Sequence, residues 1–358
     1  MNRNALRGSP GGRACRASGL ILLMLAGGVA QVAGSAPDPE IAPYRAGPTV
    51  AGELRAWGYR SFKETFALWT ERFGVHFPGI RPSAQLFPGT SPGNAALMTG
   101  VAELALFGRE IRPNEVVSFG RVFPYEQTAV RVAGGAFDTP NKTPAIGVYV
   151  HRENPLAKLS LTQLDAIYSA ERLRGGAAAI TKWGQLGLTG EWAEKPITVY
   201  GIPKPFGTAE FVRIRVFNDA TWAAHVRLPP GSPTKLAITA GEEFYEAMIK
   251  ALEADRHAIG FLIGHYATPN VKPLALAEQD GGPWFDYTRA NVITRDYPLS
   301  RLVYIIVNKD PAKPWDPRVR EFLSFVLSRE GQQAVVDAGV FTPLPESVLK
   351  VERAKLEK

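Results

Sequence analysis

The sequence predicts an α/β protein, because short continuous apolar runs alternate with amphipathic segments along most of its 358 residues. The apolar runs lie at 104–107, 145–150, 197–200, 258–263 and 302–307. Continuous apolar runs are typical of parallel strands that are covered on both faces, so we expect parallel sheets between layers of helices. At about 150 residues per domain, the length predicts two domains.

The helices are predicted from the spacing of apolar residues and from their capping signals. Ser61 and Glu64 form a capping box ahead of an apolar stripe that includes Trp69 and Phe73. Ser160 with Gln163 predicts the start of a helix over 161–168, and Asp316 with Pro317 predicts the start of one over 319–327. Two further amphipathic segments lie at 211–217 and 244–252.

The composition excludes several classes of protein. Apolar residues make up 45% and charged residues 21%, which fits neither a disordered chain nor a protein with many membrane spans. The single cysteine, Cys15, excludes a disulfide framework and cysteine-based metal sites. The five histidines lack the close spacing of metal ligands, and no phosphate-binding loop or dinucleotide fingerprint occurs, so we expect no metal and no cofactor.

The first 36 residues are predicted to be a signal peptide that directs export of the chain. Four arginines precede an apolar run over 20–32, and small residues follow through Ala36. A retained membrane anchor is the alternative, but the run is shorter than the roughly 20 residues that cross a bilayer. Removing the segment leaves 37 basic and 34 acidic residues, a net charge of +3 instead of +7. This small excess does not indicate nucleic-acid binding.

Two turns between a predicted strand and a helix have the residues of an anion site. In the turn at 88–94, Ser91 suits the N-cap and Pro92 the first helical position, with Thr90 and Gly93 beside them. In the turn at 204–208, Thr208 suits the N-cap and Gly207 allows close approach of a ligand to the backbone. Free N–H groups at a helix start bind negatively charged oxygen.

A third turn adds a positive charge. Arg109 directly follows the predicted strand at 104–107, and its guanidinium can match two oxygens of an oxyanion. Each of the three features is also common in structural roles: a serine often only caps a helix, and a lone arginine is often solvated or ion-paired. Their combination in one α/β chain predicts one oxyanion held by both domains.

With these residues in view, the chain resembles the periplasmic phosphate-binding proteins of ABC phosphate importers, which have the type II periplasmic binding-protein fold. The resemblance extends from about residue 57 to residue 344. The matching stretches, which follow in the family's order, are 89–93, 146–155, 160–164, 206–211, 258–261, 297–301 and 319–323.

The resemblance implies two α/β lobes with a ligand cleft between them. The first lobe would consist of residues 37–148 and 270–358, and the second of residues 149–269. The family's ligand residues correspond to Thr90, Ser91, Gly207 and Thr208, and in some members also to Arg109; we add the turn at Gly93 as a source of backbone N–H groups. A monomer would capture inorganic phosphate or a related oxyanion and present it to an inner-membrane permease.

The chain also departs from the family pattern. Phe206 occupies a position where members usually have serine, and Ile202 occupies one where they commonly have arginine. The acidic residue with which many members accept the proton of phosphate is absent near Gly108. Arg60 and Lys204 are candidates for substitute charge, and the identity of the anion stays open.

Two other functions remain as alternatives to anion capture. The stretch 89–93 matches the G-x-S-x-G turn of serine hydrolases, which would make Ser91 a nucleophile. The backbone N–H of the next residue is needed there to bind the oxyanion, and Pro92 has none. The second alternative is a secreted interaction protein of the same fold that binds no anion.

Overall fold

The computed structural model describes residues 36–233 and 240–357. The predicted signal peptide lies outside this range except for Ala36. Within the described residues, no helix combines the length and the apolar composition that a membrane span requires.

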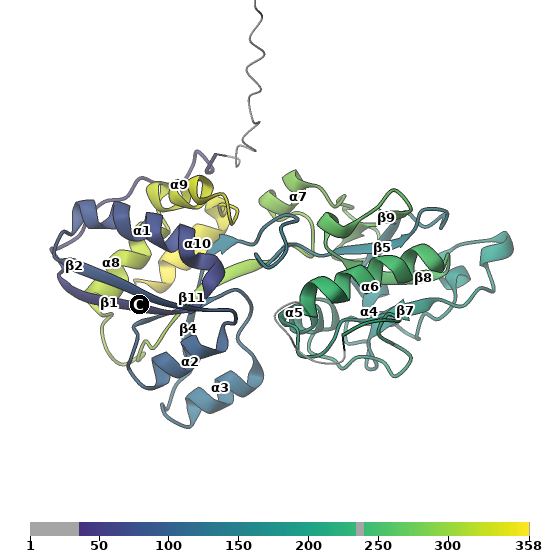
Figure 1. Cartoon of the computed structure of the whole chain (residues 1–358), viewed down its shortest axis with the longest axis horizontal. Helices are drawn as coiled ribbons and strands as arrows, with labels where there is room; N and C mark the ends of the chain where they lie inside the picture. Colours follow the sequence, from purple (N-terminus) through teal and green to yellow (C-terminus); the bar gives the residue numbers. More distant parts are fainter. Residues whose placement is uncertain (1–35, 234–239, 358) are drawn as a thin grey trace, which may run out of the picture. The chain divides into compact units, whose positions relative to one another are not determined.

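The first of the two main sheets has five strands in the order β2-β1-β3-β11-β4 (Figure 1). Strand β1 pairs in parallel with β2 and β3, whereas β11 is antiparallel to both β3 and β4. The strands are β1 Gly52–Tyr59, β2 Ile80–Phe87, β3 Leu104–Phe107, β4 Thr128–Gly134 and β11 Leu302–Val307.

Helices cover both faces of this sheet (Figure 1). One face carries α1 Lys63–His76, α8 Pro317–Val326, α9 Arg329–Ala338 and α10 Glu346–Lys355, and the other carries α2 Ser91–Met98 and α3 Pro113–Gly120. Strand β3 serves both layers, because Leu104 and Leu106 pack in the core with Trp69, whereas Phe107 packs with Phe119. This arrangement explains why β3 is continuously apolar.

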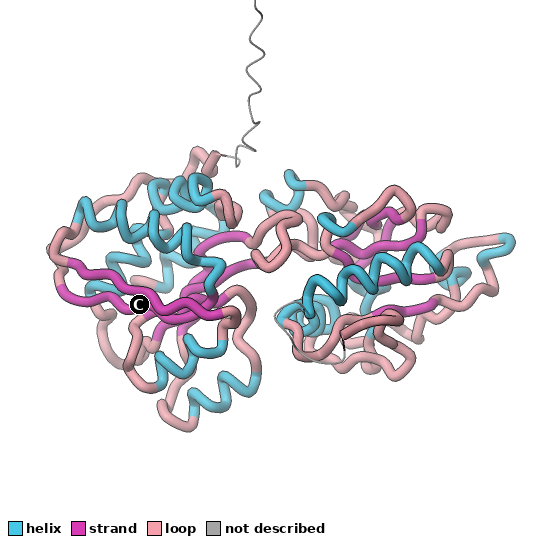
Figure 2. The backbone as a smooth tube through the Cα atoms, viewed as in Figure 1, coloured by secondary structure: helices cyan, strands magenta, loops and turns pink. Residues whose placement is uncertain are grey.

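The second main sheet has four strands in the order β7-β8-β5-β9, shown in magenta in Figure 2. These strands are β5 Gly147–His151, β7 Thr198–Tyr200, β8 Ala258–Leu262 and β9 Val271–Pro273. A separate pair joins β6 Lys158–Ser160 and β10 Ala275–Ala277. The helices here are α4 Leu161–Tyr168, α5 Gly207–Phe217, α6 Ala240–Ala254 and α7 Arg289–Thr294. Their core includes the fully buried Tyr168, Trp183, Phe217 and Phe261.

Four short 3₁₀ helices complete the regular structure of the described residues. They are η1 Arg60–Phe62, η2 Trp183–Leu186, η3 Gly190–Trp192 and η4 Gly264–Tyr266.

The predicted α/β class and the five predicted strands are confirmed, but the expectation of parallel sheets is wrong. Both main sheets are mixed. In the five-stranded sheet the chain leaves after β4 and returns along β11, the neighbour of β4. The N–H of Gly135, just after β4, donates to the carbonyl of Arg301, just before β11, so the end of one strand lies beside the start of the other and the pair is antiparallel.

Two predicted helix starts are confirmed and three caps are wrong. Ser160 and Asp316 cap α4 and α8 through their side chains. Ser61 does not cap α1, because its hydroxyl donates to the carbonyl of Asn141 instead. Helix α2 begins at Ser91 and helix α5 begins at Gly207, so Ser91 and Thr208 lie in the first turns and are not N-caps.

The lobe limits remain a prediction. Strand β9 pairs with β5, and Leu274, Tyr297 and Leu299 pack into the same core as the second sheet. We therefore propose that the second lobe extends to about residue 299, beyond the predicted limit at residue 269.

Candidate functional site

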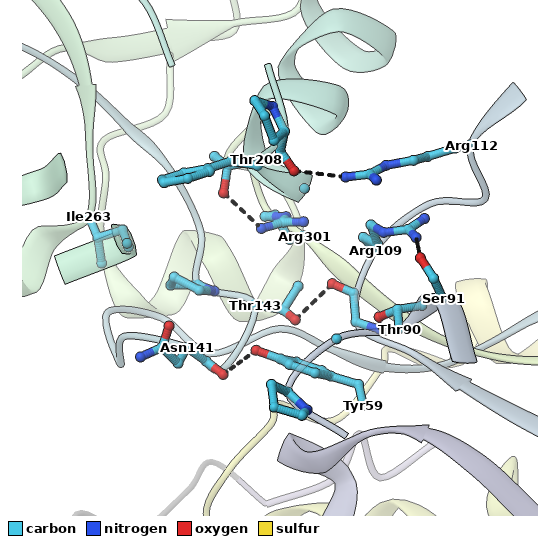
Figure 3. Close-up of a pocket in the computed structure, with 18 of the residues that line it drawn as sticks. Tyr59, Thr90, Ser91, Arg109, Arg112, Asn141, Thr143, Thr208, Ile263 and Arg301 are labelled. Atoms are coloured by element: carbon cyan, nitrogen blue, oxygen red, sulfur yellow. Dashed lines mark hydrogen bonds between the residues drawn. The ribbon is translucent and has the colours of Figure 1, made fainter. Parts of the chain in front are cut away.

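A cavity of about 400 Å³ lies where turns from elements of both main sheets meet (Figure 3). Residues that precede or begin α2, follow β3, begin α5 and precede β11 all line it. Its polar and charged side chains are those of Tyr59, Thr90, Ser91, Arg109, Arg112, Asn141, Thr143, Thr208, Tyr245 and Arg301.

The first group of lining residues surrounds the start of α2. Thr90 is buried, and its hydroxyl accepts a hydrogen bond from the N–H of Gly108 over 3.3 Å. Ser91 lines the cavity as the first residue of the helix. Gly93 lies within the helix and does not line the cavity; its N–H donates to the carbonyl of Thr90, and a Cβ atom there would lie 2.8 Å from the carbonyl oxygen of Trp57. Gly93 therefore allows α2 to pack closely on β1.

Arg109 is held by a buried carboxylate. Its Nη1 and Nη2 atoms donate to the two oxygens of Glu115 over 2.7 and 2.6 Å. Nη1 also donates to the carbonyl of Glu110, and Nη2 donates to Ser91 Oγ over 3.1 Å. Burial alone would raise the pKa of Glu115, but the hydrogen bonds and positive charge of Arg109 outweigh this effect, and the pKa lies below its ordinary value.

Ser91 does not have the surroundings of a hydrolase nucleophile. Its hydroxyl donates to Glu115 Oε1 over 3.2 Å as well as accepting from Arg109. All five histidines lie in the described part of the chain, and none of them lines the cavity. A serine nucleophile needs an adjacent base, and the carboxylate beside Ser91 is a poor one, because it is ion-paired with Arg109 and its pKa is lowered.

The second group of lining residues forms the start of α5. The first N–H groups of a helix have no acceptor within the helix, so those of Gly207 and Thr208 are available to a ligand. A Cβ atom on Gly207 would lie 3.2 Å from Cδ of Arg109, which places this backbone close to the arginine side chain. Tyr245 is buried beside Thr208, and burial raises its pKa to about 12.

Arg301 directly precedes β11 and is 5% exposed. Its Nη1 atom donates to Thr208 Oγ1 over a long 3.5 Å, as Figure 3 shows. The guanidinium also lies 5.1 Å from the ring centre of Phe211. Its Nε atom is buried and has no hydrogen-bond partner, and no carboxylate of the described residues forms an ion pair with it.

In the described part of the chain, the charged side chains that line the cavity are all basic. Three guanidinium groups line it, including that of Arg112, whose Nη2 atom donates to the carbonyl of Pro205 over 3.0 Å. Burial and the neighbouring charge of Arg109 lower the pKa of Arg112. No aspartate or glutamate is among the described residues that line the cavity. Such a site favours a ligand with negative charge and several acceptor oxygens.

Five of the six predicted ligand residues meet at this cavity, namely Thr90, Ser91, Arg109, Gly207 and Thr208. Gly93 does not, and the candidate substitute charges Arg60 and Lys204 do not line it either. Arg112 and Arg301 also line the cavity, and sequence reasoning named neither of them as a candidate. Arg301 stands in one of the stretches that carry the family resemblance, which was the available signal.

The fold and the cavity define a two-lobed solute-binding protein of the type II class. Residues 44–330 match the sequence profile of the PBP superfamily domain. The phosphate-binding protein PstS of Pseudomonas aeruginosa, in strains PAO1 and UCBPP-PA14, is 33% identical over 91% of this chain and 94% of its own length. The chain therefore belongs to the PBP superfamily and, within it, to the family of PstS phosphate-binding proteins.

A solved structure agrees in fold. The crystal structure of PstS from Borrelia burgdorferi matches with a TM-score of 0.51 and 16% identity, over 82% of this chain and 98% of that chain.

Proposed function

We propose that this protein is a periplasmic receptor that captures phosphate, or a closely related inorganic oxyanion, and presents it as a monomer to an inner-membrane ABC permease. Family membership supports the ligand class, since the relatives of highest identity described above are named phosphate-binding proteins. The mechanism is reversible binding and involves no covalent step. The predicted signal peptide supports the periplasmic location.

One observation carries this proposal. The starts of α2 and α5, which accompany different main sheets, line the same cavity with hydroxyl groups and with backbone N–H groups. Thr90, Ser91, Gly207 and Thr208 bring these donors, and the arginines bring positive charge. An enclosed anion needs most of its oxygens hydrogen-bonded, and donors from two directions meet that requirement.

The direct test is calorimetric titration of the purified chain with inorganic phosphate. We expect a single site, with thermal stabilisation that increases with phosphate concentration. Thr208→Val should weaken binding roughly two- to tenfold, because one hydrogen bond to the anion is lost. Thr99→Val, at the far end of α2 and outside the cavity, should bind as the unchanged protein does.

Two results would favour the alternative functions, an interaction protein without a ligand and a serine hydrolase. A chain that binds no phosphate, sulfate or other oxyanion would contradict the proposal and favour an interaction protein without a ligand. Turnover of activated esters that is lost in Ser91→Ala would instead establish a serine hydrolase.

A further inference from the structure

The arginines of the cavity differ in how their charge is compensated. Arg109 and Glu115 form a two-pronged ion pair, with each side chain 8% exposed. Four of the donated hydrogen bonds of Arg109 are already made within the protein, to Glu115, Glu110 and Ser91. Its charge is therefore neutralised where it stands, and few of its N–H groups remain for a ligand.

The positive charge of Arg301, in contrast, is not compensated by an ion pair among the described residues. Arg301 is as deeply buried as Arg109, yet its guanidinium makes a single long hydrogen bond, to Thr208. Its Nε atom is buried without a partner, and among the described residues no carboxylate lies within ion-pair distance of it. A buried charge without a counter-ion is costly, so its retention indicates a negatively charged partner that is not part of the chain.

The position of Arg301 fits such a partner. The guanidinium lines the cavity beside Thr208, in the first turn of α5 (Figure 3). The ring of Phe211 packs against the guanidinium and limits its orientation. A planar guanidinium that presents unused N–H groups matches two oxygens of a tetrahedral anion.

The main chain of Arg301 ties this charge to the other half of the molecule. Arg301 directly precedes β11 of the five-stranded sheet. Its main-chain carbonyl accepts a hydrogen bond from the N–H of Gly135, which follows β4 of the same sheet. Its side chain meanwhile contacts α5, which packs on the second core. An anion at Arg301 would thus bind to groups attached to both sheets.

We infer that Arg301 supplies the principal positive charge that holds the anion, and that Arg109 is a positioning residue that fixes Ser91 and the start of α3 through Glu115. This inference rests on the proposed function, because it assigns roles within the same cavity.

The test compares Arg301→Gln, Arg301→Lys and Arg109→Gln in two measurements: calorimetric affinity for inorganic phosphate and the melting temperature without phosphate. Arg301→Gln should lose roughly tenfold to hundredfold in affinity, whereas its melting temperature without phosphate should stay the same or rise, since an uncompensated buried charge is removed. Arg301→Lys should fold and bind phosphate with intermediate affinity, because lysine keeps the positive charge but lacks the paired N–H donors of the planar guanidinium.

Arg109→Gln should behave in the reverse way. Its melting temperature without phosphate should fall, because the buried carboxylate of Glu115 is left unpaired, and its loss of affinity should be smaller than that of Arg301→Gln. If the unchanged chain binds phosphate and Arg301→Gln binds it equally well, the role assigned to Arg301 is wrong while the proposed function stands. Unfolding of Arg301→Gln would also contradict it. If the unchanged chain binds no phosphate, the proposed function itself fails.

Discussion

Arg109 donates to both carboxylate oxygens of Glu115, over 2.7 and 2.6 Å, in a buried position at the edge of the cavity. The carboxylate also accepts from the main-chain N–H of Arg112 and from the hydroxyl of Ser91. This one ion pair therefore links the turn after β3, the start of α2 and the start of α3.

Removal of the Glu115 charge should destabilise the fold. In Glu115→Gln the guanidinium of Arg109 remains buried without its counter-ion, and breaking a buried pair in this way costs about 3–5 kcal/mol. Urea unfolding of the purified chain measures the change. The matched control is Glu194→Gln, which removes an exposed ion pair with Lys182 and should leave the unfolding midpoint almost unchanged. Equal unfolding midpoints for Glu115→Gln and Glu194→Gln would show that the buried pair with Arg109 stabilises the fold no more than an exposed ion pair does.

The same pair predicts a dependence on pH. The pKa of Glu115 is lower in the folded protein than its ordinary value of 4.5, so the folded state binds this proton less readily than the unfolded state. Its contribution to stability is complete above pH 4.5 and is lost as the pH falls through the lowered pKa. The stability difference between the unchanged chain and Glu115→Gln should therefore narrow in acid, and a constant difference would contradict this account.

Gly108 should not tolerate a side chain. A Cβ atom there would lie 2.6 Å or less from two ring atoms of Tyr59 and 2.9 Å from Oγ1 of Thr143. Gly108→Ala should cost about 1–3 kcal/mol through overpacking and should displace Tyr59 from the cavity wall. Gly89→Ala is the control: it also lies on the cavity, with nothing within 4 Å of the added carbon. In both thermal unfolding and phosphate titration, Gly108→Ala should differ from the unchanged chain more than Gly89→Ala does.

The described residues that line the cavity include no carboxylate, which predicts weak discrimination between phosphate and sulfate. A carboxylate would accept the proton of a protonated phosphate and repel sulfate, which has no proton to donate. The described lining residues offer arginines and hydroxyls instead. We expect sulfate to displace phosphate in a competition titration, with affinities within roughly a hundredfold. Complete indifference to sulfate would indicate that main-chain carbonyls supply the missing acceptor.

Sequence reasoning recovered the strands whose residues form a continuous apolar run. Strand β11 was predicted with its observed limits because all six of its residues are apolar, and β3 because it is buried on both faces. Strand β2 was missed because it lies at the edge of the sheet and most of its residues are exposed, so it has no apolar run. Strand β1, with its alternating burial, was missed too.

The candidate site was predictable only in part, for a physical reason. The turns at 88–94 and 204–208 contain glycine and hydroxyl residues whose local chemistry is readable in one segment. The roles of Arg109 and Arg301 depend instead on whether a carboxylate side chain points at them, and Glu115 does so for Arg109 from the first turn of α3, six residues further along the chain. A sequence does not state which arginine lacks such a neighbour.

The place of β11 in the five-stranded sheet constrains how the chain acquires its structure during synthesis. This strand lies between β3 and β4, although almost 170 residues separate it from the latter along the chain. The ribosome must finish residues 302–307 before that sheet can close, whereas every strand of the four-stranded sheet has by then been synthesised. The five-stranded sheet consequently stays incomplete until late in translation.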